Sequence, residues 1–229
     1  GAWSDFEYDF SGSTFFYPID LTKSYYKKPV NFSGAIYQGM ADFSGSTYEK
    51  GVLFSAPDSP STYQGWANFS GSTYQGWADF TGSTYQGWAY FTGSTYNDVA
   101  DFSGSVFYQK VYFGADGDNS SFSRFADCAP QFYNETNHTN TLFGSPNNDF
   151  TVENGRGYPI YRNLDGLPLG CSFLTTEQKE YLEYKIQEID ETNNKLREVK
   201  DSKEKEELSK KLQALNKELY EWRKEATTV

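Results

Sequence analysis

Residues 63–73 read Tyr-Gln-Gly-Trp-Ala-Asn-Phe-Ser-Gly-Ser-Thr, residues 74–84 read Tyr-Gln-Gly-Trp-Ala-Asp-Phe-Thr-Gly-Ser-Thr, and residues 85–95 read Tyr-Gln-Gly-Trp-Ala-Tyr-Phe-Thr-Gly-Ser-Thr. The same eleven-residue pattern extends in both directions, interrupted by a four-residue insertion near Pro57 to Pro60. It gives ten units, which begin at Ser4, Phe15, Tyr26, Tyr37, Tyr48, Tyr63, Tyr74, Tyr85, Tyr96 and Phe107. Internal repeats of this kind predict that equivalent residues share one structural environment.

Each unit carries large aromatic and small residues at fixed places. The fifth place holds a small or β-branched residue in most units, and the seventh holds Phe in every unit but the second, which has Leu21. Aromatic and β-branched residues bounded by Gly and Ser favour short strands joined by turns. We therefore expect a mainly β fold with a helical tail, in which Phe69, Phe80 and Phe91 lie in ordered rows.

An antiparallel meander is one fold that suits the unit. Each unit would supply a seven-residue strand and a four-residue Ser-Gly-Ser-Thr turn. Trp66, Trp77 and Trp88 would then form an aromatic row across neighbouring strands, at the strand spacing of about 4.8 Å. Such a row suits stacking on sugar rings or on another copy of the protein, although tryptophan is also a common core residue.

A β-solenoid is the other fold that suits it. Residues 78–82 read Ala-Asp-Phe-Thr-Gly, which resembles the pentapeptide-repeat family: a small residue, Asp or Asn, a bulky centre, Ser or Thr, and Gly. The resemblance covers about residues 8–113 and implies a four-sided right-handed β-solenoid with the small and bulky residues inside. The eleventh residue of each unit departs from the family's strict five. Tyr-Gln-Gly-Trp is also similar to the Tyr-x-Gly-x-Trp core of MORN-repeat hairpins, with one residue fewer.

Two prolines bear on the choice between these folds. Pro18 and Pro29 occupy the fourth place, in the middle of a meander strand, where proline would remove a ladder hydrogen bond. At a solenoid corner, outside any strand, these prolines would cost little stability. The turn-like Ser-Gly-Ser-Thr segments favour the meander, so both folds stay open.

Beyond the repeats of residues 1–113, we expect an irregular, loop-rich β segment over residues 114–174. It contains Cys128 and Cys171, which we predict to form a disulfide, with two free thiols as the alternative. Five Asn-x-Ser/Thr sequons are candidate glycosylation sites, namely Asn31, Asn68, Asn119, Asn134 and Asn137. Cysteines and sequons together favour an extracellular setting, at a cell or virion surface.

The tail, residues 175–229, is expected to form a helical hairpin or one long coiled-coil helix. Thr175 and Gln178 make a capping-box pattern, and Asp201-Ser202 suggests a break and a second helix start. An apolar seam follows the second half of the tail, at Leu208, Leu212, Leu215, Leu219 and Trp222. We predict that this seam contacts other subunits; packing on its own β-domain is the alternative.

Signs of catalysis are weak. The chain has one histidine, no nucleophile elbow and no phosphate-binding loop, and the sixth-place carboxylates recur with the repeat, as structural residues do. We expect no enzyme activity, cofactor or metal site. A net charge of −11 argues against nucleic acid as a partner, and no run is long enough to span a membrane.

The expected function is that of a self-assembling structural protein, such as a filament, fibre, surface-layer or virion subunit, whose partner is itself. The alternatives are a secreted carbohydrate-binding adhesin, with glycans as partners, and an intracellular pentapeptide-repeat module for protein interaction.

Overall fold

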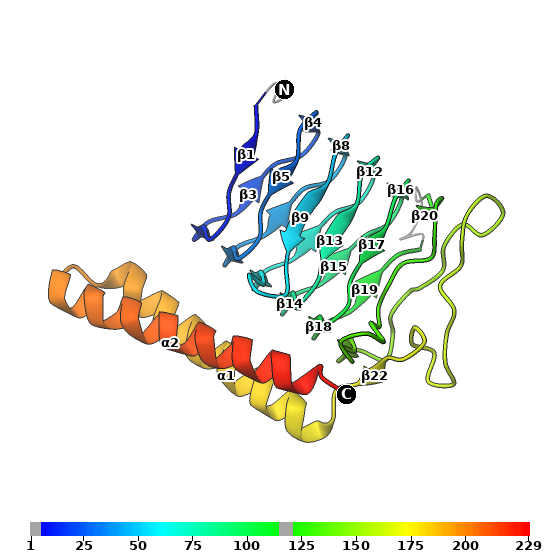
Figure 1. The fold of residues 1–229 in the computed structure, drawn as a ribbon. Coiled ribbons are helices and arrows are strands. Elements are labelled where there is room, and N and C mark those ends of the chain that lie inside the picture. Colours follow the sequence, from blue (N-terminus) through cyan, green and yellow to red (C-terminus); the bar gives the residue numbers. More distant parts are fainter. Residues whose placement is uncertain (1–5, 115–120) are drawn as a thin grey trace.

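The computed structural model describes residues 6–114 and 121–229, which form a parallel β-solenoid of about five turns with two helices along one side (Figure 1). Strands 22 residues apart pair in parallel, as Thr73 does with Thr95. One turn therefore contains two eleven-residue units. The meander is excluded, and the parallel solenoid is compatible with a pentapeptide-repeat-like fold.

Four sheets make up the sides of the solenoid, in the order in which the chain reaches them. The first contains β1 (Tyr8–Asp9), β5 (Val30–Asn31), β9 (Val52–Ser55), β13 (Ala78–Phe80) and β17 (Ala100–Asp101). The second contains β2 (Thr14–Phe15), β6 (Ile36–Tyr37), β10 (Thr62–Tyr63), β14 (Thr84–Tyr85), β18 (Val106–Phe107), β21 (Leu142–Phe143) and β22 (Ser172–Phe173). The third contains β3 (Ile19–Asp20), β7 (Ala41–Asp42), β11 (Ala67–Asn68), β15 (Ala89–Tyr90) and β19 (Val111–Tyr112). The fourth contains β4 (Tyr25–Tyr26), β8 (Thr47–Tyr48), β12 (Thr73–Tyr74), β16 (Thr95–Tyr96) and β20 (Arg124–Phe125).

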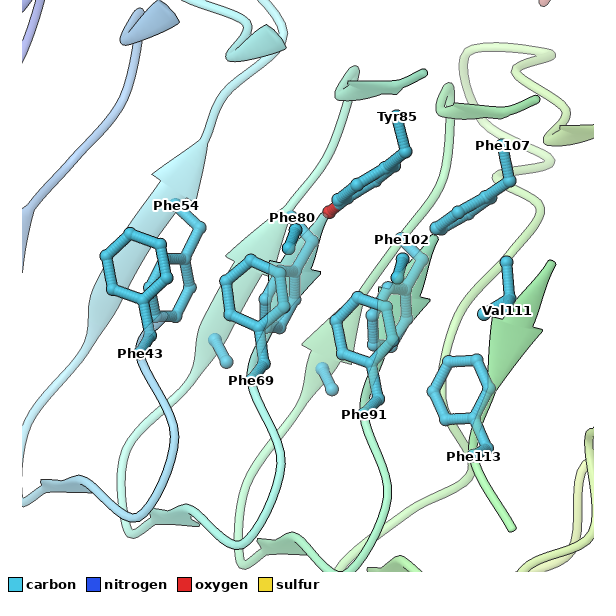
Figure 2. Close-up of a cluster of buried hydrophobic side chains, with 14 of the residues drawn as sticks. Phe43, Phe54, Phe69, Phe80, Tyr85, Phe91, Phe102, Phe107, Val111 and Phe113 are labelled. Carbon is cyan, nitrogen blue, oxygen red and sulfur yellow. The ribbon is translucent and has the colours of Figure 1, made fainter. Parts of the chain in front are cut away.

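The core consists of columns of aromatic rings that run along the axis. Phe69 stacks on Phe91 at 5.0 Å and Tyr63 on Tyr85 at 4.9 Å, and Figure 2 shows the phenylalanine columns. Rings from consecutive units meet edge to face instead, a favourable aromatic geometry. Phe69, Phe80 and Phe91 are all fully buried, so the predicted ordered rows are confirmed.

A serine ladder satisfies backbone amides between the coils. The amide of Ser46 donates to Oγ of Ser72 at 3.2 Å, and the amide of Ser72 donates to Oγ of Ser94 at 3.2 Å. The carboxylates of the sixth place accept from the amide two residues later, as Asp79 does from Thr81 at 2.8 Å. These side chains shape the corners, which accounts for their periodic recurrence.

Glycine is needed at two kinds of corner. In Ser-Gly-Ser, Gly71 and Gly82 have φ of +62° and +69°, which other residues rarely adopt. In Gln-Gly-Trp, a Cβ on Gly87 would lie 2.6 Å from the carbonyl oxygen of Gly65 in the preceding coil. Pro18 and Pro29 also lie between strands rather than within them, which explains how the solenoid accommodates them.

The segment after residue 113 continues the solenoid rather than leaving it. β20, β21 and β22 extend two of the sheets, and Phe132 and Phe143 stack on Phe102 and Phe107. Loop residues then pack on the last rings, with Val152, Ile160 and Leu167 buried in the same core. These loops close the C-terminal end of the molecule.

The tail forms the predicted hairpin of α1 (Thr176–Glu198) and α2 (Ser202–Ala226), with the capping box of Thr175 and Gln178 in place. The hairpin lies along the second sheet, whose outward side chains at Val106 and Leu142 share a hydrophobic cluster with Leu182, Ile189 and Leu215. Asn193 contacts Gln64, and Arg197 contacts Gln38 and the carbonyl of Phe16. The hairpin thus runs the length of the solenoid.

Candidate functional site

The tryptophans of the repeat lie at exposed corners. Side chains of Ala67, Phe69, Ser72 and Tyr74 are buried, and the next inward residue is Ala78. The extra residue of the eleven-residue unit is therefore the Trp of Gln-Gly-Trp, which projects outward. Trp66, Trp77 and Trp88 are 53%, 43% and 46% exposed.

The three indoles do not form one row. Trp66 and Trp88 directly precede β11 and β15 of the third sheet, whereas Trp77 precedes β13 of the first. Successive units face opposite sides because each unit is half a turn. The predicted row depends on the meander, and the structure replaces it with a pair and a separate indole.

Trp66, Trp88, Tyr90 and Tyr112 form a cluster that we call the aromatic platform. The Tyr90 ring meets both indoles edge to face at 6.4 Å and stacks on Tyr112 at 4.8 Å. Lys110 places its ammonium 4.4 Å from the Tyr112 ring centroid. A cavity of about 220 Å³ is lined by the two indoles with Gln86, Gly87 and Gln109. Flat rings beside amide groups can stack on a sugar and hydrogen-bond to its hydroxyls.

Trp77 is packed differently. It lies over Gly51, where a Cβ would be 2.1 Å from the Trp77 ring, and Val99 occupies the corresponding place in the next coil. Within residues 6–114 and 121–229 it therefore has no indole partner on its side, and it provides a matched control for the platform.

The first coil presents a second candidate surface. β1, β2, β3 and β4 are the end strands of the four sheets within the described residues. Ile36 and Gln38 donate to the carbonyls of Ser13 and Phe15, so the amide and carbonyl of Thr14 point away from β6. Phe6, Phe16 and Tyr17 are exposed nearby, Tyr17 at 74%. Within the described residues this strand edge has no partner strand, and such an edge bordered by aromatic side chains is a candidate site for pairing with another chain.

The tail seam is occupied within its own chain. Leu212, Leu215 and Leu219 are buried in a cluster with Val106 and Leu142, while Leu208 and Trp222 are partly buried. Trp222 stacks on Tyr181 of α1 at 5.2 Å. These side chains therefore lie between the hairpin and the β-domain, which is the alternative to the predicted contact between subunits.

The predicted disulfide is not supported, since Cys128 and Cys171 are both free. The Cys171 thiol is buried and points to the carbonyl of Phe132 at 3.7 Å. Burial raises its pKa to about 12, and burial with the neighbouring Asp127 and Asp98 raises the pKa of Cys128. Both thiols are thus protonated and poorly nucleophilic at neutral pH.

The sequons lie in two settings. Asn31 and Asn68 are repeat residues whose Oδ1 accepts from the amide two residues later, and the middle residue of each sequon, Phe32 or Phe69, is in the core. Asn134 and Asn137 lie in the loop that joins β20 to β21, where Asn137 is exposed. Asn119 lies outside the described residues. Glycosylation stays a prediction at all five.

Neither metal ligands nor a membrane helix are found within residues 6–114 and 121–229. No three His, Cys, Asp or Glu side chains come together there as a metal site would require, and neither helix is apolar enough to cross a bilayer. Comparison of the chain with protein-family models, with curated proteins and with solved structures found no match.

One notable residue was missed by sequence reasoning. Arg223, near the end of α2, is buried and contacts a solenoid corner. Its position in a Lys- and Glu-rich helix gives no periodic signal, and its burial follows only from how the hairpin docks.

Proposed function

We propose that this repeat protein is a non-enzymatic structural protein that pairs with itself through the first coil of its solenoid. The observation that carries the proposal is the set of four end strands at that coil, with exposed aromatic side chains beside them. An extracellular or cell- or virion-surface setting goes with the proposal.

The covered C-terminal end of the core favours one geometry of pairing. Head-to-tail growth needs a free strand edge at both ends, but the loops after β20 cover the last rings. First coil against first coil avoids this obstacle, and such pairing would give a closed two-fold dimer. Side chains of both charges in this coil, such as Asp9, Asp20, Lys23 and Lys28, suit such self-complementary contact.

The helical hairpin supports the same arrangement. Arg197 already reaches the first two coils, and the connection between α1 and α2 projects past β1 (Figure 1). The projecting end, residues 198–207, is almost entirely exposed. It is placed to lie beside the first coil of a partner.

Sedimentation velocity over a dilution series tests the proposal with a matched pair of variants. Thr14→Pro removes an outward-pointing amide, whereas Thr14→Val keeps it. Because proline has no N–H, the carbonyl that accepts from Thr14 in the pair would be buried without a donor, which costs about 1–3 kcal/mol, so the proline variant is expected to dissociate at a concentration at least about fivefold higher. A monomer at all concentrations, or equal dissociation of both variants, would refute pairing through this edge.

Carbohydrate binding is a second candidate function, favoured by the aromatic platform and its cavity. Paired indoles flanked by Gln86 and Gln109 suit a sugar chain lying along the third sheet. Trp88→Ala should abolish retention on a glycan array, while Trp77→Ala should leave it unchanged. Equal loss in both variants, or no retention of the native chain, would contradict this function.

A further inference from the structure

A cavity of about 180 Å³ lies at the corner between the first and second sheets. Its floor is formed by the corner glycines Gly82 and Gly104. Its walls come from segments outside the regular coils: the insertion at residues 57–58, the loop at residues 137–139 and the end of α2. The insertion, a loop and the end of α2 therefore converge on one corner from three separate parts of the chain.

Arg223 is the central side chain of this cavity, which we call the Arg223 pocket. It is only 4% exposed, and its guanidinium lies close above Gly82, 3.2–3.4 Å from the position of a Cβ there. Nη1 donates to the carbonyl of Gly104 at 2.6 Å, but Nε is buried without a hydrogen-bond partner. Nε of the guanidinium therefore remains free to donate a hydrogen bond to a ligand.

The positive charge of Arg223 has no carboxylate partner within residues 6–114 and 121–229. Its described contacts are the Gly104 carbonyl and the Tyr220 ring, 5.6 Å away. Desolvation lowers the pKa of this guanidinium to about 10. A buried cation in this state is stabilised by a bound anion, because buried charges are normally paired.

Two further groups in the lining suit an anion. Thr81 is buried, and its Oγ1 lies beside the Asp79 carboxylate without a hydrogen bond of ordinary geometry. Lys224 lies at the rim and adds a second cation, whereas Asp58 on the insertion brings the opposing charge. Tying α2 to the solenoid explains the bond to Gly104, but it leaves Nε of Arg223 buried without a partner.

We propose that the Arg223 pocket binds a small tetrahedral oxyanion, either free phosphate or the end of a phosphomonoester. Arginine is well suited to such a ligand because its planar donors match two oxygens at once. The Thr81 hydroxyl donates to a third oxygen, and Lys224 lies at the mouth. The pocket is independent of the pairing surface and of the aromatic platform.

Calorimetric titration of the full chain with inorganic phosphate, at constant ionic strength set with chloride, tests the proposal. Thr81→Val should weaken binding severalfold, while Thr92→Val, at the same place of the next repeat unit, should leave it unchanged. Asp58→Asn should tighten binding because it removes the opposing charge, and Arg223→Met should weaken it by at least about tenfold.

The Thr81 and Asp58 variants keep the test decisive even if Arg223→Met fails to fold. A parallel titration with glycerol 2-phosphate distinguishes the two sources: tighter binding of the ester assigns the pocket to phosphomonoesters, and tighter binding of phosphate assigns it to the free ion. No heat and no thermal stabilisation with either compound would overturn the proposal. Equal weakening by Thr81→Val and Thr92→Val would do so as well.

Discussion

Phe69 and Phe80 are one repeat apart, and their rings meet edge to face across the core, with centroids 5.2 Å apart and planes at 87°. Phe69 and Phe91, two repeats apart, instead stack with planes at 7°. One unit is thus half a turn, and odd and even units supply opposite columns of the core (Figure 2). Side chains at the same place of the repeat therefore lie on the same side of the solenoid only when they are two units apart.

Truncating one ring of a column should destabilise the whole solenoid. Phe80 is fully buried and contacts Phe54, Phe69, Phe91 and Phe102. Phe80→Ala is expected to lower the free energy of unfolding by about 3–5 kcal/mol, measured by urea denaturation. Phe122→Ala, at an exposed ring, should change it little. Similar losses in the two variants would contradict the columnar core.

The glycine column at the Gln-Gly-Trp corner gives a second stability test. A Cβ on Gly87 would collide with the backbone of Gly65, which cannot move without separating two coils. Gly87→Ala should therefore cost about 1–3 kcal/mol. Gly155→Ala, where no atom lies within 4 Å of the new Cβ, is the control and should be neutral in the same thermal unfolding assay.

Much of this fold is predictable from sequence. The repeat, its inward residues, the capping box and the hairpin all follow from local patterns. The choice between meander and solenoid does not, because eleven residues suit either a strand and turn or half a coil. Because of that ambiguity, the meander predicts Trp77 beside Trp66 and Trp88, whereas the solenoid separates it from them. Pro18 and Pro29 distinguish the two folds, because proline lacks the N–H that a central meander strand needs, whereas a solenoid corner does not need it.

Tertiary docking explains the remaining differences. The spacing of Leu212, Leu215 and Leu219 shows that one side of α2 is apolar, but it does not identify what covers that side. The apolar side of α2 is covered by the outward residues Val106 and Leu142, which replace the usual threonine. The Arg223 pocket depends on the same docking and has no sequence signature of its own.

Alkaline pH should unfold the protein cooperatively. Burial raises the pKa of Tyr37, Tyr48, Tyr63, Tyr74, Tyr85 and Tyr96 well above the ordinary value of a phenol. The unfolded state then binds fewer protons than the folded state above about pH 10, so stability falls by up to about 1.4 kcal/mol per pH unit for each tyrosine. Below that pH these groups leave stability unchanged.

Phenolate absorbance and circular dichroism followed together measure this effect. The buried tyrosines should ionise only as the β signal disappears, in one transition. Ionisation of all tyrosines before any loss of structure would contradict a dry, intact tyrosine core.

Charges on the hairpin seam should detach the helices without separating the paired molecules. Leu212→Asp with Leu219→Asp places two carboxylates against the second sheet, and the expected result is protease cleavage within residues 175–229. Sedimentation should still show the pair, because the first coil is untouched. Gln213→Asp with Lys217→Asp, at exposed positions of α2, is the control. Loss of pairing with an undamaged hairpin would instead assign the contact to the seam.

Spin-label distances test pairing through the first coil most directly. A single label at Tyr17 or at Leu164, both exposed, is introduced with Cys128 replaced by serine and Cys171 left buried. Because both labels at position 17 lie in the paired first coils, the account predicts an intermolecular distance below about 35 Å there, which for comparison is the length of a 23-residue helix such as α1. At position 164, near the closed end, it predicts more than about 50 Å, since the seven strands of the second sheet in each of two molecules lie between the labels. A short distance at position 164, or none at position 17, would contradict it.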